Sequence, residues 1–589
     1  MSNERTQKLL ALLLLLLAGL AVYRPSLNCG FNYDDILVIR DNDFISHPAN
    51  LLRLWGRAYL RAAGEETYRP LVTASYLVDH LFWGKEPFGY ALTNLLLGVF
   101  SAWLLFLLLR RLFPDGKAAA GLAAGLYLLH PALVETIAVP SNREQILSVF
   151  LLLLAGCCWT AGLDERPRRA RWLSPFFLLA ACYTLEWGVL WPAVLTGLAF
   201  VRGDGWRQAW RRTWPEWLVA WLYLFLWVFA HPRQPADTAW LGGGPAGGLW
   251  AFGVLFWRYV RLAFLPIALR PSYLLHAPVA LAGWAAQIGL WLVVLGAAIG
   301  LLKRKRAALG AGIFLLALLP VSHIFMPFWI VMAERYLALP LIGLLPLVAA
   351  GVWRLPKTAR WAVAALLILS FGWLAHAQVG VWRDPLSLWS RAVALEPDDP
   401  IGWTNYGAAL AQRGDYAAAA EAQRQAWEAG ARSGKKTAGL ALNYARGLAK
   451  TGRAAEACRV LLDSQPSIEV NRDWLLAAGQ YCARSDKTAS SRAFATLLLT
   501  GRSDCEAWSL FCATAEKETE SCLQQAFLMC PEDGTLWLQV AGIHAGQGND
   551  LKCLQALAMA QRDPRAGQWR AVSLQILLTL KEKLRLATP

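Results

Sequence analysis

Residues 9–22 read LLALLLLLLAGLAV, and residues 32–35, a short way beyond them, read Asn-Tyr-Asp-Asp. The apolar run follows the basic residues Arg5 and Lys8 and precedes no small-residue cleavage site, which is typical of a retained membrane anchor rather than a signal peptide. Two adjacent carboxylates beside an aromatic ring, where such a helix reaches water, could bind a divalent cation or deprotonate a hydroxyl group. An ordinary polar loop would have the same composition, so the rest of the chain must decide.

The 589-residue chain is 56% hydrophobic, and the apolar residues are concentrated before residue 380. This distribution predicts an all-α protein with a polytopic membrane bundle over residues 1–380, a linker over 381–400 and a soluble helical domain over 401–589. We expect about eleven transmembrane helices. The apolar segments lie at 9–22, 89–109, 118–130, 144–162, 172–184, 187–201, 216–230, 281–302, 308–321, 338–353 and 361–376.

The net charge of +16 would suit a nucleic-acid-binding protein, but the basic residues fall in short loops between apolar segments. Basic loops of this kind mark the cytoplasmic side of a membrane protein. The pattern therefore predicts a cytoplasmic N-terminus, an extracytoplasmic soluble domain and no nucleic-acid partner. The lack of an Asn-x-Ser/Thr sequence favours a bacterial inner membrane over the endoplasmic reticulum.

The soluble region repeats with a period near 34 residues, as tetratricopeptide helix pairs do. Small residues that let two helices cross closely recur in the first two copies, at Gly407, Gly414, Ala445 and Gly452. We expect about five helix pairs, a closing helix from Trp569 and a concave binding face. Seven cysteines occur here, and no spacing indicates a zinc site. Some could pair if the compartment is oxidising, but buried single thiols are the favoured interpretation for several.

Polar residues form four patches on the predicted outer side of the bundle. Charged groups at a membrane boundary are costly unless they are paired or functional, so each patch is either a structural ion pair or part of a site. A further pair, Arg258 and Arg261, lies three residues apart on one helix face and could clamp a phosphate or anchor the helix. We expect His276 and His323 to be structural. The patches are Asp34-Asp35; His130 with Glu135, Arg143 and Glu144; Glu186; and Glu334-Arg335-Tyr336.

Taken together, these motifs resemble the transmembrane and tetratricopeptide-repeat-containing proteins, which are O-mannosyltransferases. The resemblance covers nearly the whole chain. The matching motifs are Tyr33-Asp34-Asp35, Tyr68-Arg69-Pro70-Leu71, Asn94-Leu95-Leu96-Leu97, His130-Pro131 with Glu135, Met332 to Pro340, and Trp382-Arg383-Asp384 running into repeats. The chain departs from the family's pattern at Tyr90-Ala91, Gly98, Leu185-Glu186 and Ser272-Tyr273.

The resemblance implies a C-type (GT-C) glycosyltransferase fold and a polyprenyl-phosphate-linked sugar donor. It also implies that an acidic residue of the first outer loop, here Asp34 or Asp35, acts as base or metal ligand. We expect Asp34, Asp35, Glu135 and Glu186 as catalytic candidates, with Asp34, Asp35 and Glu135 as possible ligands of Mg²⁺ or Mn²⁺. The donor phosphate would be bound by four arginines, Arg69, Arg258, Arg261 and Arg335. The site would be supported by Tyr33, His130, Arg143, Glu334 and Tyr336.

Two function classes follow from these residues. The first is an inverting sugar transferase in which the repeats hold a protein or peptide acceptor over the site. The second is a non-catalytic membrane scaffold whose repeats recruit partners for envelope assembly. A transporter ranks third, because no inverted internal repeat is recognisable. Replacement of both aspartates by asparagine separates the first two, since a scaffold would tolerate it.

Overall fold

The computed structural model describes residues 2–56, 67–162, 171–229, 241–275, 280–325, 330–434, 436–464, 471–500 and 504–514, and most of 522–563. Every regular element within these ranges is a helix, which confirms the all-α class. The chain divides into two compact units, Met1–Glu396 and Pro397–Pro589. The assignment of these units to a membrane domain and an extracytoplasmic domain stays a prediction.

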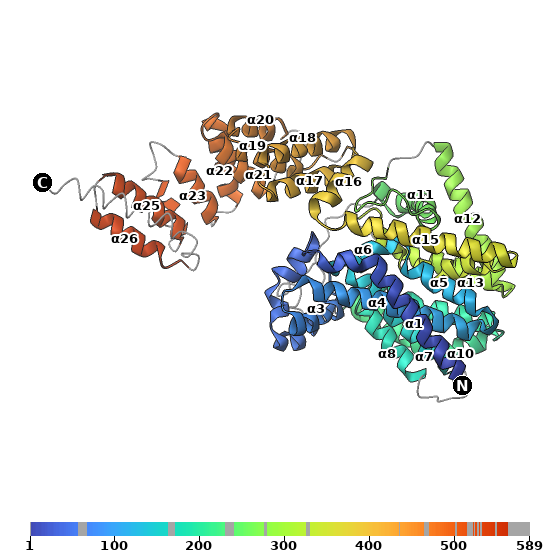
Figure 1. Ribbon diagram of the computed structural model, residues 1–589. Helices are drawn as coiled ribbons and strands as arrows, with labels where there is room; N and C mark the ends of the chain where they lie inside the picture. Colours follow the sequence, from blue (N-terminus) through green and yellow to red (C-terminus); the bar gives the residue numbers. More distant parts are fainter. Residues whose placement is uncertain are drawn as a thin grey trace. The chain divides into compact units, whose positions relative to one another are not determined.

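The first unit begins with α1 (Ser2–Tyr23), which packs against α4 (Pro87–Leu112) and α15 (Lys357–Val381) (Figure 1). The opposite face of α1 exposes leucines such as Leu10 and Leu17, as a helix surrounded by lipid does. At its end, the buried Tyr23 hydroxyl donates to the carbonyl oxygen of Leu128 at 3.0 Å. This bond fixes the point at which the chain leaves the bundle for the Asn-Tyr-Asp-Asp loop.

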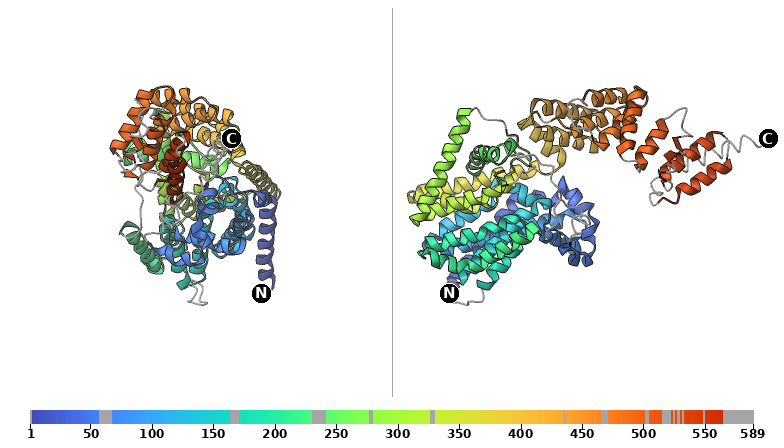
Figure 2. Two further views of the ribbon diagram at one scale, coloured as in Figure 1. Left: turned by 90° about the vertical axis from the view of Figure 1, so that its left-hand side faces the viewer. Right: turned by 180° about the vertical axis from the view of Figure 1, so that it is seen from behind.

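The remaining helices of the first unit complete the bundle. These are α3 (Pro70–Trp83), α5 (Lys117–Leu128), α6 (Val134–Ala138), α7 (Arg143–Ala161), α8 (Leu173–Cys182), α9 (Trp191–Val201), α10 (Trp206–Phe229), α11 (Pro245–Phe264), α12 (Ala280–Leu302), α13 (Arg306–Leu318), α14 (Pro340–Val352) and α16 (Pro385–Leu395). In both figures α12 stands at the edge of the unit (Figures 1 and 2). Only 11% of its most apolar stretch is buried, so α12 presents an apolar face to its surroundings.

Five helices of the described residues are long and apolar enough to cross a membrane, at Glu4–Asn28, Pro87–Leu112, Pro140–Ala161, Leu281–Leu302 and Lys357–Val381. A bent pair, Lys117–Leu128 and Pro131–Ala138, would add a sixth. Four shorter apolar helices lie at Leu173–Cys182, Glu186–Val201, Arg306–Val321 and Pro340–Val352. The chain is thus a multi-pass integral membrane protein, while the count of eleven crossings stays a prediction.

The second unit consists of antiparallel helix pairs (Figure 1). The first pair is α17 (Pro400–Gln412) with α18 (Tyr416–Arg432), and the second is α19 (Ala438–Lys450) with α20 (Ala454–Ser464). They are followed by α21 (Arg472–Cys482) with α22 (Lys487–Thr500), then α23 (Cys505–Thr514), and α25 (Gly534–Gln547) with α26 (Asp550–Ala560). A Cβ atom on Gly407 would lie 2.5 Å from the Gln423 amide nitrogen, so a larger residue here would require the Gln423 side chain to shift. The expected closing helix at Trp569 lies outside the described residues.

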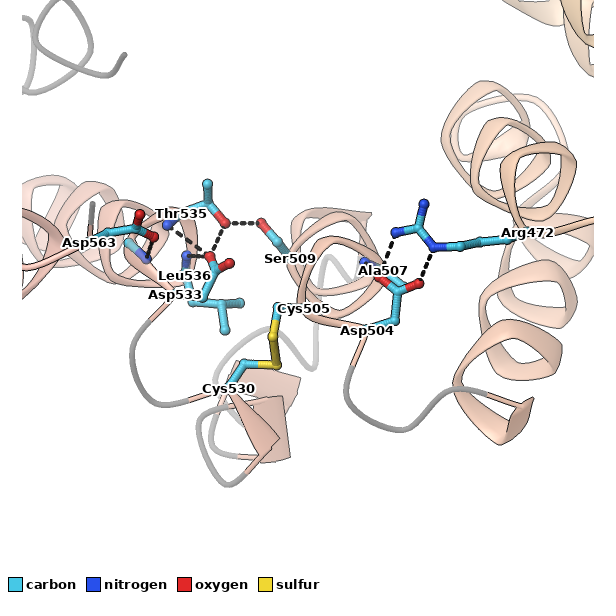
Figure 3. The surroundings of a disulfide bond; sticks show 11 residues. Arg472, Asp504, Cys505, Ala507, Ser509, Cys530, Asp533, Thr535, Leu536 and Asp563 are labelled. Atoms are coloured by element: carbon cyan, nitrogen blue, oxygen red, sulfur yellow. Dashed lines mark hydrogen bonds and ion pairs between the residues drawn. A yellow bond between two sulfur atoms is a disulfide. The ribbon is translucent and has the colours of Figure 1, made fainter. Parts of the chain in front are cut away.

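Three disulfides cross-link helices of the second unit, which corrects the expectation of several single thiols. Cys458 bonds Cys482, Cys505 bonds Cys530, and Cys512 bonds Cys522, whereas Cys553 is buried and takes part in none of these three disulfides. Figure 3 shows the Cys505–Cys530 bridge between α23 and the chain that leads into α25. The sequence could not reveal these pairs, because the distance between two cysteines depends on how neighbouring helices pack.

Candidate functional site

The Asn-Tyr-Asp-Asp loop is held from two sides. The side-chain amide of Asn32 donates to the carbonyl oxygens of Trp382 and Arg383 at 3.3 and 3.0 Å. Tyr33 adopts a left-handed backbone with a φ of 51°, and its ring lies 5.5 Å from that of Trp389. A non-glycine residue in this conformation is costly and persists only where its surroundings enforce it. The surrounding residues therefore hold the loop in a defined conformation.

The two aspartates of this loop occupy different environments. Asp34 is exposed. Asp35 is 1% exposed, and its carboxylate accepts hydrogen bonds from the backbone N–H groups of Asn32 at 3.1 Å and Ser141 at 2.7 Å. Burial raises the pKa of Asp35 to about 6, against the opposing effect of these two donors. Asp35 thus ties the loop to the segment before α7, and Asp34 is the carboxylate that a substrate can reach.

Glu135 and Arg335, 200 residues apart in sequence, form a buried ion pair next to this loop. The Arg335 guanidinium binds one Glu135 carboxylate oxygen, and its backbone N–H donates to the other at 3.1 Å. Partial burial raises the pKa of Tyr33 to about 12, and the charges of Asp34, Arg335 and Glu135 also act on it. The structure therefore brings the first and the last of the four predicted patches within electrostatic range of each other.

Arg69 joins two further predicted groups to this cluster. Its guanidinium lies 3.6 Å from a Glu144 oxygen and 3.7 Å from a Glu186 oxygen. Tyr336 is buried, with its ring 5.3 Å from that of Trp187 and 5.3 Å from the Arg335 guanidinium. Two arginines and three glutamates thus form one network, in which Glu186 serves as a partner of Arg69.

Glu334 connects this network to a second group of residues. One of its carboxylate oxygens accepts from the Tyr273 hydroxyl at 2.6 Å and from the backbone N–H of Arg270. The other oxygen is buried and has no hydrogen-bond partner among the described residues. Burial, and then the charge of Glu135, raise the pKa of Glu334 well above its usual range. A carboxyl group in this position favours its protonated form.

A cavity of about 650 Å³ opens between α11 and α12, with three arginines in its wall. The sequence predicted Arg258 and Arg261 as phosphate-binding residues. It did not predict Arg270, which lies in an irregular segment where no helical spacing relates it to the other two. Arg270 pairs with Glu396 at 2.9 Å, whereas Arg258 binds only the backbone oxygen of Leu274 and Arg261 has no ion-pair partner within the described ranges. Burial and the nearby Arg270 lower the pKa of Arg258. The cavity thus has uncompensated positive charge, as an anion site requires.

Two predicted supporting residues lie apart from this cluster. His130 is buried, with its ring nitrogens bonded to the Ala263 oxygen and the Ala132 N–H. Arg143 is fully buried and binds Asp79 at 2.5 Å, Asn94 at 2.6 Å and the Tyr90 oxygen at 3.0 Å. Both therefore support the packing of the bundle. His323 bonds the Val331 oxygen, in keeping with a structural role, and His276 lies outside the described residues.

One departure from the family's pattern has a packing reason. A Cβ atom on Gly98 would lie 2.9 Å from the Cδ1 atom of Ile137, so a larger side chain at this position would require the Ile137 side chain to shift.

The three carboxylates considered as metal ligands do not meet as a set. Asp35 is engaged by backbone N–H groups, and Glu135 by Arg335. Within the part of the chain that the structure describes, no three His, Cys, Asp or Glu side chains are grouped so as to hold a metal ion. These donors do not fit Mg²⁺ or Mn²⁺, which need several free oxygen ligands. No step below is assigned to a metal.

The fold and the site define a class: a multi-pass helical membrane protein with a cationic cavity, an acidic loop and a C-terminal array of helix pairs. No family model matches the chain. Among curated proteins it is similar to protein O-mannosyl-transferase Tmtc3 of Drosophila melanogaster, with 25% identity over 512 residues. It is also similar to Tmtc1 of the same fly, with 37% identity over 185 residues, and to human TMTC2, with 29% identity over 177 residues. These relatives confirm the resemblance that the motifs indicated.

The extent of these similarities differs. The match to Tmtc3 covers 70% of this chain and 54% of the relative. The matches to Tmtc1 and human TMTC2 cover 29% and 28% of this chain, and 21% of each relative. The chain thus spans about half the length of the relative that it matches most extensively among these three.

Proposed function

We propose that the protein is a membrane glycosyltransferase that moves a sugar from a polyprenyl-phosphate-linked donor to a hydroxyl group of a protein acceptor. The observation that carries this proposal is the arginine cavity, which is linked through Tyr273 and Glu334 to the Glu135–Arg335 pair, whose charges act on Tyr33 of the acidic loop. All three relatives are named protein O-mannosyl-transferases, which makes mannose the proposed sugar.

The donor binds in two parts. Its phosphate meets Arg258 and Arg261, which have no carboxylate partner among the residues that the structure describes and can therefore offer their N–H groups to a phosphate. Its polyprenyl chain follows the exposed apolar face of α12, which forms the other wall of the cavity through Ala282, Ala285 and Ala286. A lipid-linked donor thus reaches the arginines without leaving the membrane.

Transfer inverts the configuration of the sugar. The acceptor hydroxyl oxygen attacks the anomeric carbon, and the bond from that carbon to the phosphate oxygen breaks. The hydroxyl proton passes to the Asp34 carboxylate, which is exposed and so able to meet the acceptor. Polyprenyl phosphate leaves with its negative charge stabilised by the arginines. Asp35 and the Asn32 bonds hold the loop in position.

The second unit holds the acceptor. Stacked helix pairs of this kind offer an extended surface for a peptide. Its three disulfides support an extracytoplasmic location, because disulfides persist in oxidising compartments and are rare in the cytosol. With the basic loops on the cytoplasmic side, the acidic loop and the repeats then face the same compartment, which we propose is the periplasm of a bacterium.

A pair of matched variants tests this proposal. Asp34→Asn removes the proposed base, whereas Asp41→Asn removes an exposed carboxylate of the same loop that pairs with Arg40. With purified full-length protein, polyprenyl-phosphate mannose and acceptor protein, we expect transfer to fall about 10²- to 10⁴-fold for Asp34→Asn and to be kept for Asp41→Asn. Equal transfer by both variants would favour the scaffold function.

A further inference from the structure

A second cavity, of about 630 Å³, lies among α4, α5, α7, α9, α13 and α14. Its size falls in the range of ligand pockets, which is about 300–1,000 Å³. Among the described residues that line it none is acidic, and most are aliphatic. It shares no lining residue with the arginine cavity described above. The proposed transferase chemistry leaves this second cavity unused.

One face of α14 forms the long wall of the cavity. The lining residues Gly343, Leu347, Ala350 and Gly351 recur at the three- and four-residue spacing that places side chains on one helix face. From Ile342 to Gly351 the helix rises about 14 Å, at 1.5 Å per residue. That length is about half of the ~30 Å hydrocarbon core of a bilayer. The cavity therefore has the depth of one membrane leaflet.

The two ends of the cavity differ in polarity. Arg306 and Arg354 lie at one end, and both are exposed and form no ion pair within the described ranges. The Arg306 guanidinium lies 4.9 Å from the centre of the Phe113 ring, and Trp353 also lines this end. Arginine and aromatic side chains together are typical of the membrane–water interface. The predicted cytoplasmic loops contain both arginines.

At the other end, Trp191 is 2% exposed, and its indole N–H has no hydrogen-bond partner among the described residues. Buried indole N–H groups usually find a partner. The Trp191 N–H is covered by neighbouring atoms, so it adds no polar group to the apolar interior of the cavity.

We infer that this cavity binds an anionic membrane lipid. The hydrocarbon chain of the lipid fills the cavity that α4, α5, α7, α9, α13 and α14 enclose, and its phosphate headgroup meets Arg306 and Arg354 at the open end. An apolar interior of one-leaflet depth suits the chain, and two arginines without carboxylate partners suit the phosphate. The site lies at the end of the bundle with the basic loops, away from the acidic loop.

The test uses full-length protein in detergent, with native mass spectrometry and thermal unfolding as readouts. The probes are phosphatidylglycerol, phosphatidylcholine with the same chains, and inorganic phosphate. We expect phosphatidylglycerol to stay bound and to raise the melting temperature, and the other two probes to do neither. The double variant Arg306→Gln/Arg354→Gln should weaken phosphatidylglycerol binding about tenfold or more. The control Arg202→Gln/Arg207→Gln, which removes two basic residues that do not line the cavity, should leave binding unchanged.

A second variant tests the apolar part of the site without touching its charge. Gly351 lines the cavity and a Cβ atom there would meet no atom within 4 Å, so Gly351→Leu adds apolar bulk at the cavity wall with room for its Cβ atom. Gly296→Leu on α12 is the control, because its Cβ also meets nothing and it does not line the cavity. We expect only Gly351→Leu to abolish the stabilisation by phosphatidylglycerol. Equal binding of phosphatidylcholine, or unchanged binding by both Gly351→Leu and the arginine double variant, would overturn the inference.

Discussion

Arg261 offers the sharpest test of the donor site, because it is exposed and has no ion-pair partner within the described residues. Replacing it with glutamine should change the free energy of unfolding by less than about 0.5 kcal/mol. A hydrogen bond to a charged group contributes about 1.5–3 kcal/mol. Solvent screening places Arg261 near the lower end, so we expect the dissociation constant of the donor to rise about tenfold. Arg258 is more buried, and Arg258→Gln should cost nearer to a hundredfold.

Trp257 lines the same cavity, so quenching of tryptophan fluorescence by polyprenyl-phosphate mannose provides the binding assay. Arg391→Gln is the matched control, since Arg391 is an exposed arginine of α16 that does not line the cavity. Thermal unfolding of each variant shows whether it is folded. Donor binding by a folded Arg261→Gln variant as tight as that of the control would refute the assignment of the phosphate to this cavity.

Three other predictions concern the rest of the molecule. Because burial raises the pKa of Asp35 to about 6 from an ordinary value near 3.8, its contribution to stability is present at low pH and lost as pH rises through 6. Thermal unfolding should therefore show wild type losing roughly 3 kcal/mol relative to Asp35→Asn between about pH 4 and pH 7; a constant difference would contradict the shift. Deletion of residues 401–589 should leave donor binding within a few-fold and abolish transfer to the natural acceptor; unchanged transfer would show that the repeats do not hold the acceptor. Cysteine labelling should place Arg207 in the cytoplasm and Trp403 outside, and a cytoplasmic Trp403 would contradict the predicted membrane topology.

Local patterns were enough to predict the helical class, the helix pairs and two cavity arginines. Hydropathy and repeat spacing act over a few residues, and Arg258 and Arg261 share a helix face by spacing alone. The contacts that define the site join distant parts of the chain. The Glu135–Arg335 pair spans 200 residues, and the Asn32–Arg383 bond spans 351. Contacts at such separations depend on how the bundle packs, which sequence spacing does not reveal.

The split between Asp34 and Asp35 is the clearest example of what the sequence could not provide. Adjacent and chemically identical, the two residues are equivalent in sequence. The left-handed turn at Tyr33 and the two backbone donors bury one carboxylate and leave the other exposed. The cysteines make the same point, since the three disulfides depend on how neighbouring helices pack and not on the spacing of the cysteines in the sequence.

The most direct measurement of the central claim follows the sugar itself. Purified full-length protein in lipid nanodiscs is incubated with polyprenyl-phosphate mannose labelled with ¹³C at the anomeric carbon, together with acceptor protein, and the product is analysed by NMR. The account predicts mannose joined to an acceptor hydroxyl with the anomeric configuration opposite to that of the donor. Transfer with retained configuration, or no transfer by folded protein that binds the donor, would contradict it.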